Sequence, residues 1–154
     1  MTELVELYKK LEQYSHFEED EENWEHFVDT FDAIVSKGDP ASIPELLKYL
    51  DDQCEYDYVQ GHLIRALETF RDEVYVISII KNICNLLVKS SYLCVDIIKR
   101  ILNNNNCLSI FRENMHLADK ESLLKLFKIM EEESPHHREL IQELRAEIET
   151  SHKE

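Results

Sequence analysis

The sequence predicts an all-α fold of helices paired through short turns. Among its 154 residues are only 2 glycines and 3 prolines, so few residues interrupt helices. Apolar residues recur in segment after segment at the i, i+3, i+4, i+7 spacing of one helix face. An apolar fraction of 44% is sufficient for a hydrophobic core. The length favours one domain, over residues 1–154, with the last few residues disordered.

Four helices are expected in the first half of the chain. They are a helix capped by Thr2 that reaches Tyr14, and helices over 20–37, 40–50 and 56–70. Gly38 marks the end of the second helix, and Asp39-Pro40 marks the start of the third. Gly61 lies inside the fourth helix, where glycine costs about 1 kcal/mol relative to alanine. It is acceptable there if another backbone packs closely.

Five further helices are expected in the second half. Their ranges are 73–88, 91–102, 107–115, 120–132 and 135–150. The first of them is apolar over most of its circumference and is expected to be the central, most buried helix. Asp119 and Ser134 are expected to cap the last two. The four asparagines at 103–106 are expected to form a polar break.

Helical hairpins of roughly 35–45 residues are typical of HEAT or armadillo repeats. The segments GDPASIPELLKYLDD and KSSYLCVDIIKRILNN are the most repeat-like, but the units are only weakly similar to one another. We therefore predict an irregular HEAT-like α-solenoid of eight or nine paired antiparallel helices. A compact helical bundle is the alternative.

Acidic residues are concentrated in the N-terminal part of the chain. The formal net charge is -15, and residues 1–60 hold 17 acidic and 4 basic residues. Such a surface repels nucleic acids and anionic membranes, whereas it attracts a basic protein and accelerates the encounter. The simpler interpretation is that the charge keeps a small protein soluble.

The sequence favours a reduced, cytoplasmic protein that binds no membrane. The four cysteines show no CxxC spacing, and three of them lie in apolar runs. The first residues are amphipathic and unlike a secretory leader, and no apolar stretch is long enough to span a bilayer.

Enzyme motifs are missing from the sequence. There is no phosphate-binding glycine loop and no recognisable nucleophile frame, so we expect neither catalysis nor a cofactor. Two ExxH pairs, Glu113 with His116 and Glu133 with His136, have the spacing of di-iron ligands. Pro135 is expected to start a new helix inside the second pair, which argues against a metal site.

The remaining candidate is an acidic and aromatic surface for a protein partner. Tyrosines among carboxylates suit a surface rich in Lys and Arg, because Tyr offers apolar area and a polar tip. The alternative is that these tyrosines fold into the core. His62 and Glu68 are either core or groove residues. The candidate binding residues are Asp51, Asp52, Glu55, Tyr56, Asp57, Tyr58, Glu21, Glu22 and His62.

One stretch also resembles a known family. The segment IPELLKYLDDQCEYDYVQGHLIRALETF, followed by DEVYV, is similar to the characteristic segment of Imm30-type immunity proteins of bacterial polymorphic toxin systems. The similarity covers about residues 33–75. The matching features are Ile43-Pro44 with Leu46-Leu47, Asp51-Asp52, Glu55-Tyr56, His62 and Glu68. The resemblance implies an all-α protein that neutralises a toxin encoded by the neighbouring gene.

Three functions follow as hypotheses. The first is an immunity protein, monomeric and non-enzymatic, that binds a basic, nuclease-type toxin through its acidic surface. The second is a HEAT-like scaffold or adaptor that holds a peptide or helix of a host complex in an apolar groove. The third is a helical metalloenzyme that uses the ExxH pairs.

Overall fold

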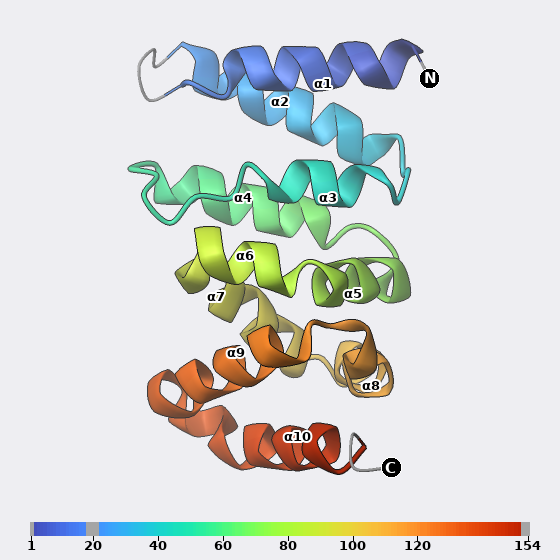
Figure 1. Ribbon diagram of the computed structural model, residues 1–154. Coiled ribbons are helices and arrows are strands. Elements are labelled where there is room, and N and C mark those ends of the chain that lie inside the picture. The colour runs from blue at the N-terminus through green and yellow to red at the C-terminus, as the bar shows by residue number, and fades with distance from the viewer. Residues whose placement is uncertain (1, 18–21, 152–154) are drawn as a thin grey trace. The chain divides into compact units, whose positions relative to one another are not determined.

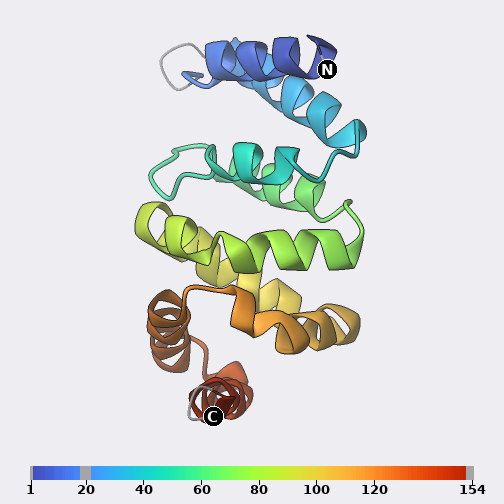
Figure 2. The same cartoon turned by 45° about the vertical axis from the view of Figure 1, so that its right-hand side comes forward.

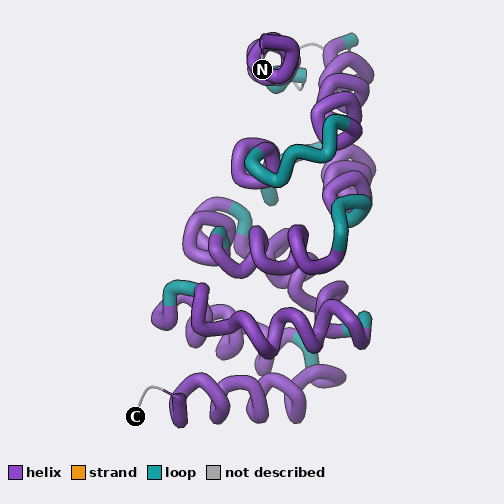
Figure 3. The backbone as a smooth tube through the Cα atoms, turned by 90° about the vertical axis from the view of Figure 1, so that its right-hand side faces the viewer, coloured by secondary structure: helices purple, strands orange, loops and turns teal. Residues whose placement is uncertain are grey.

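The computed structural model describes residues 2–17 and 22–151 and divides the chain into two compact units, 1–75 and 76–154. In these described ranges there are ten α-helices and two 3-10 turns, and no strand (Figure 3). The predicted all-α class is confirmed. The HEAT-like arrangement, with a compact bundle as its alternative, remains a prediction. The single domain also remains a prediction.

The first unit consists of two helical hairpins and the beginning of a fifth helix. Its helices are α1 (Thr2–Tyr14), α2 (Asn23–Ser36), α3 (Ser42–Leu47), α4 (Asp57–Leu67) and α5 (Asp72–Lys81), which crosses into the second unit. Within this unit, α1 lies beside α2 and α3 lies beside α4 (Figure 1). The expected cap by Thr2 and the expected helix start at Asp20 lie outside what the structure describes, as do the expected disordered residues 152–154.

The two hairpins of the first unit form two layers. Lys37 Nζ lies 2.8 Å from Glu3 Oε1, and the Tyr14 and His26 rings stack at 5.1 Å, so α1 and α2 are antiparallel. Ring and polar contacts join α2 to α4 in the same chain direction, so these two helices run parallel in one layer, with α1 and α3 in the other (Figure 3). Between the layers lie Leu11, Phe27, Phe31, Ile34, Ile43, Leu46, Leu63 and Leu67, all buried.

The second unit contains the rest of α5, then α6 (Ile83–Lys89), α7 (Ser91–Leu102), α8 (Asn105–Asn114), the turn η1 (Met115–Leu117), α9 (Lys120–Glu133), the turn η2 (Pro135–His137) and α10 (Arg138–Ser151). The last two helices pack against each other (Figure 2). Side chains from every helix of this unit meet in its core, among them Ile79, Ile83, Ile97, Ile98, Phe111, Leu123, Phe127, Ile141 and Leu144. Burial of each such side chain contributes about 1.5–3 kcal/mol.

Several predicted boundaries agree with the structure. The helix expected over 91–102 is α7, with the same ends, and α9 extends one residue beyond its expected end at 132. Gly38 follows α2 with φ +68°, and its N–H donates to the Val35 carbonyl at 2.9 Å. The expected polar break over 103–106 is shorter than predicted, since α8 begins at Asn105, where the Asn104 side chain caps it by accepting from the Cys107 N–H at 3.0 Å.

The single long helix expected over 73–88 is wrong. The structure breaks it at Asn82, where α5 ends and α6 begins. The Asn82 side chain donates to the Ser78 carbonyl at 2.7 Å, and its backbone N–H donates to the Ile79 carbonyl at 3.0 Å. Asparagine competes in this way for backbone groups and tightens the turn.

Three smaller expectations also require correction. α3 begins at Ser42 and ends at Leu47, a shorter helix than the range 40–50. The Ser134 hydroxyl makes no cap bond and instead pairs with His137 Nδ1 at 2.6 Å. No backbone packs against Gly61: the nearest atom to an added Cβ would be Arg65 Nη1, at 3.2 Å.

The two glycines generate opposite predictions. We expect Gly61→Ala to raise the free energy of unfolding by about 0.5–1 kcal/mol, because alanine favours the helix and the exposed Arg65 guanidinium can move aside. Gly38→Ala should lower it by about 1 kcal/mol, because its φ of +68° strains any residue with a Cβ. Urea unfolding followed by circular dichroism measures both. The reverse order of stabilities would contradict this account.

Asp119 generates a pH-dependent prediction. Its Oδ2 accepts from the Ser122 hydroxyl at 2.6 Å and from the Ser122 N–H at 3.1 Å, and these bonds hold the pKa of Asp119 below its usual value. A lowered pKa means that the stabilisation is present at neutral pH and is lost as pH falls through that pKa. Asp119→Ala should therefore lower the melting temperature at pH 7, with a smaller difference from wild type near about pH 3. Asp119→Asn is the control, because asparagine caps without titrating. If the difference in melting temperature between Asp119→Ala and wild type were constant with pH, the Asp119 carboxylate would be excluded as its cause.

Candidate functional site

Aromatic residues on either side of the first acidic segment, Phe17 and Trp24, contact the corner 51–58, which is distant in the sequence. That segment leads into α2 and ends with Glu22, and the corner lies between α3 and α4. The Phe17 and Tyr56 rings lie 5.7 Å apart, and the Trp24 and Tyr58 rings lie 5.6 Å apart. Glu21 lies outside the described residues.

The corner is an ordered turn that is tied to α4. The buried Gln60 side chain accepts from the Asp51 N–H at 3.0 Å. Asp51 Oδ1 in turn accepts from the Gln53 N–H at 2.9 Å, which is an Asx turn. Cys54 is buried beneath the turn, with its Sγ 3.8 Å from the Tyr56 carbonyl. The corner therefore has a fixed position relative to α4.

The predicted binding residues differ in exposure. Glu22, Glu55 and Asp57 are exposed, whereas Asp51 and Asp52 are half-buried. The two tyrosines also differ: Tyr56 is half-buried against Phe17, and Tyr58 is 56% exposed. One tyrosine of the corner therefore packs toward the interior, and the other is available at the surface.

The aromatic side chains form a continuous row from the core to the surface. Phe31 and Phe27 are buried, Phe27 contacts Phe17 at 5.1 Å, and Phe17 contacts Tyr56. The row continues through Tyr58, 5.8 Å from Tyr56, and ends at the half-buried Trp24. Trp24 is not among the binding residues predicted from the sequence. Its contact with Tyr58 joins two distant parts of the sequence, and no local pattern indicates it.

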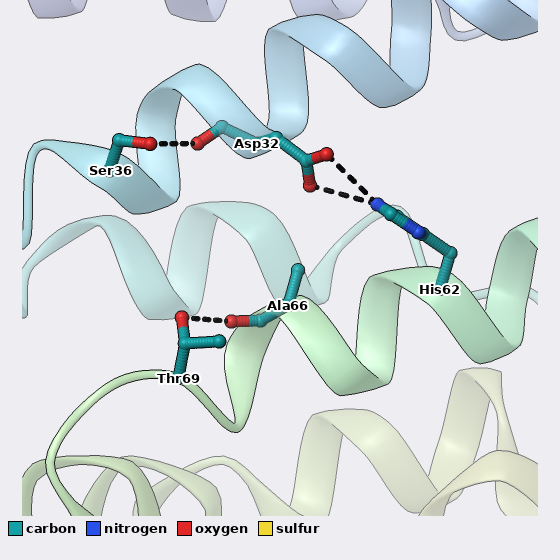
Figure 4. A network of polar contacts seen from close by, with 5 residues as sticks. All are labelled: Asp32, Ser36, His62, Ala66 and Thr69. Atoms are coloured by element: carbon teal, nitrogen blue, oxygen red, sulfur yellow. Dashed lines mark hydrogen bonds and ion pairs between the residues drawn. The ribbon is translucent and has the colours of Figure 1, made fainter.

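His62 lies on the α2–α4 face and is not a core residue. Its Nε2 lies 2.9 Å and 3.0 Å from the two carboxylate oxygens of Asp32, and both side chains are about two-fifths exposed (Figure 4). The nearby hydroxyls bond within their own chain segments, Ser36 to the Asp32 carbonyl and Thr69 to the Ala66 carbonyl (Figure 4). These two hydroxyls are therefore bonded to backbone carbonyls and not to His62. Glu68 is half-buried at the end of α4.

A shallow groove of about 390 Å³ runs along this pair of helices. Asp32 and His62 line it together with Val35, Ser36, Arg65, Ala66 and Thr69. It is lined by a mixture of apolar and charged groups.

A second tyrosine contact joins α1 to the end of α3. The Tyr49 hydroxyl donates to Glu12 Oε2 at 2.8 Å. Burial, together with this bond to a carboxylate, raises the pKa of Tyr49 above its usual value. Tyr49 therefore stays protonated as a donor that holds the two helices of this layer together.

Charge follows the division into units. Residues 1–75 hold 20 acidic and 6 basic residues, a net of -14, and residues 76–154 hold 12 and 11, a net of -1. Within the first unit, Lys37 pairs with Glu3 and Lys48 pairs with Glu45, each at 2.8 Å. No basic residue occurs within the corner 51–58.

The metal hypothesis gains no support from the ExxH pairs. Glu133 ends α9 and His136 lies in η2, so Pro135 separates the second pair as predicted. Glu113 and His116 border a cavity of about 360 Å³ in the second unit, with Arg112 and Lys120 beside them. Within residues 2–17 and 22–151, no three His, Cys, Asp or Glu side chains are grouped as a metal ion requires.

Comparison with protein families identifies one match. The family model described as Immunity protein 30 (Imm30) matches residues 13–111, a range that includes the corner and extends well beyond residues 33–75. No curated protein and no solved structure matches the chain significantly. Over the part of the chain that the structure describes, no helix has both the length and the hydropathy to cross a bilayer. Because the family model covers more than half of the sequence, the chain belongs to the Immunity protein 30 family.

Proposed function

We propose that this protein neutralises a cognate toxin by binding it directly, through the acidic and aromatic end of its first unit. Membership in an immunity-protein family implies a toxin as the partner. The observation that supports this surface is the contact of Trp24, two residues after Glu22, with Tyr58 of the corner, on a unit whose net charge is -14. The action is binding, without catalysis and without a cofactor.

The toxin domain is basic and of nuclease type in this proposal. An enzyme that cuts nucleic acid needs positive charge along its substrate groove, because phosphates provide most of the affinity. An acidic partner is attracted to that same groove and meets it faster than a neutral protein would. The proposed site comprises Asp51, Asp52, Glu55, Tyr56, Asp57, Tyr58, Glu21, Glu22 and His62.

The described members of the site have different tasks. Exposed Glu22, Glu55 and Asp57 provide the charge that the toxin meets. Asp51 acts through the turn, since its N–H and carboxylate are both bonded inside the protein. His62 borders the site along the α2–α4 face, where its ring is held by Asp32.

Charge neutralisation tests the steering role of this surface. The variant Glu22→Gln, Glu55→Gln, Asp57→Asn should associate with the toxin encoded by the neighbouring gene roughly tenfold more slowly at low salt, with a smaller difference at high salt. The matched control Glu132→Gln, Glu139→Gln, Glu149→Gln removes three exposed charges from the second unit and should associate like wild type. Stopped-flow or surface-plasmon measurements give both rates. If the two variants slow equally, net charge alone matters and the assigned surface is wrong.

Neutralisation in cells tests the function itself. Bacteria that express the neighbouring toxin should survive when this chain is co-expressed, and should lose that protection gradually as the three acidic residues are replaced. Pull-down of the toxin with the purified chain checks that binding is direct. Death of the co-expressing cells, together with no association in vitro, would remove the proposal. An affinity that salt does not change would favour the scaffold or adaptor hypothesis.

A further inference from the structure

The exposed end of the aromatic row is a rigid surface feature. Tyr58 is 56% exposed, yet it contacts Tyr56 at 5.8 Å on one side and Trp24 at 5.6 Å on the other. The Trp24 and Tyr58 planes meet at 87°, an edge-to-face arrangement. Two rings that are already held in place lose little freedom when a ligand binds to them.

Acidic residues flank both rings of this pair in the sequence. Exposed Glu25 follows Trp24 on α2, and exposed Asp57 precedes Tyr58 on α4. Exposed Glu22 lies two positions before Trp24, and exposed Glu55 lies two positions before Asp57. Arg65, the nearest cation in the sequence to Tyr58 on α4, lies with its guanidinium over Gly61. Because Tyr58 is 56% exposed, the pair is accessible to a cation from outside.

We propose that the Trp24–Tyr58 pair is the docking point for an arginine side chain of the partner protein. Aromatic faces attract cations, and carboxylates beside them supply acceptors for the N–H groups. A guanidinium is planar and weakly hydrated, so it stacks on a ring at a lower desolvation cost than a lysine ammonium does. The acidic surroundings disfavour nucleic acid, and the flanking charges disfavour a purely apolar segment.

This inference deepens the proposed function, because it rests on that function for the identity of the partner. Overall charge does not distinguish arginine from lysine, whereas the Trp24–Tyr58 pair is expected to prefer arginine. These two contributions separate experimentally, since peptides of equal length and charge differ only in the cation that they carry.

The test uses the intact chain and its single tryptophan, Trp24. Short oligo-arginine and oligo-lysine peptides of equal length are titrated at low salt, with Trp fluorescence and calorimetry as independent readouts. Wild type should change its fluorescence in a saturable way and bind the arginine peptide about fivefold or more tightly than the lysine peptide. Tyr58→Leu should reduce this preference to about twofold or less, whereas Tyr58→Phe should keep it.

Tyr92→Leu is the matched control, because Tyr92 is 73% exposed and lies in the second unit. It should keep the full preference for arginine. Circular dichroism of each variant verifies folding. Equal binding of both peptides by wild type, or a preference that survives Tyr58→Leu, would overturn the inference.

The cognate toxin distinguishes this inference from the proposed function. If the chain neutralises the toxin but shows no arginine preference, the docking point is wrong and the function stands. If the preference is present and depends on Tyr58, but the toxin neither binds nor is neutralised, the function fails and the arginine site stands.

Discussion

The packing of the Phe27 ring is the contact on which the first unit depends. Phe27 is 1% exposed and meets the rings of Phe17, Phe31 and Tyr49, which come from the segment after α1, from α2 itself and from the end of α3. One side chain thus joins three parts of the chain. Since Phe17 also contacts Tyr56, the position of the corner follows from the same core.

The acidic charge imposes a cost that this packing must offset. Carboxylates gathered on one unit repel one another and weaken the compact state. The buried rings and aliphatic side chains between the two layers supply the compensating free energy, and the few ion pairs are exposed and contribute little. A basic partner would relieve the same repulsion. In the proposed function, charge that lowers the stability of the free protein would therefore add to its affinity for a basic toxin.

Much of the fold could be predicted from the sequence, because helix ends are local. The ends of α7, the stop at Gly38 and the cap at Asp119 all depend on residues within a turn of the boundary. The break at Asn82 was missed, because the apolar periodicity continues through it. Whether an asparagine side chain bonds to solvent or to a carbonyl such as that of Ser78 cannot be read from periodicity. The row from Phe27 to Trp24 was missed for another reason. Two of its contacts, Phe17 with Tyr56 and Trp24 with Tyr58, join residues more than 30 positions apart, and no local pattern encodes them.

The candidate site was predictable in part for the same reason. The corner was identified because acids and tyrosines are consecutive there, but its division into exposed and bonded residues was not. Whether Tyr56 or Tyr58 faces solvent depends on where α2 lies, which is a tertiary property. The choice between a core and a groove position for His62 likewise depends on its contact with Asp32, which is 30 positions away in the sequence.

The bond from the Asp51 N–H to Gln60 has a consequence for how such a surface can change over evolution. The backbone path of the corner is held by Gln60, Asp51 and Cys54, which are all turned inward or bonded. The side chains at 55 and 57 are exposed, and the hydrogen bonds of Gln60 and Asp51 do not involve them. They are therefore open to replacement with little disturbance of the scaffold beneath. In the proposed function, replacements at these positions would change which toxin is recognised while the loop keeps its backbone path.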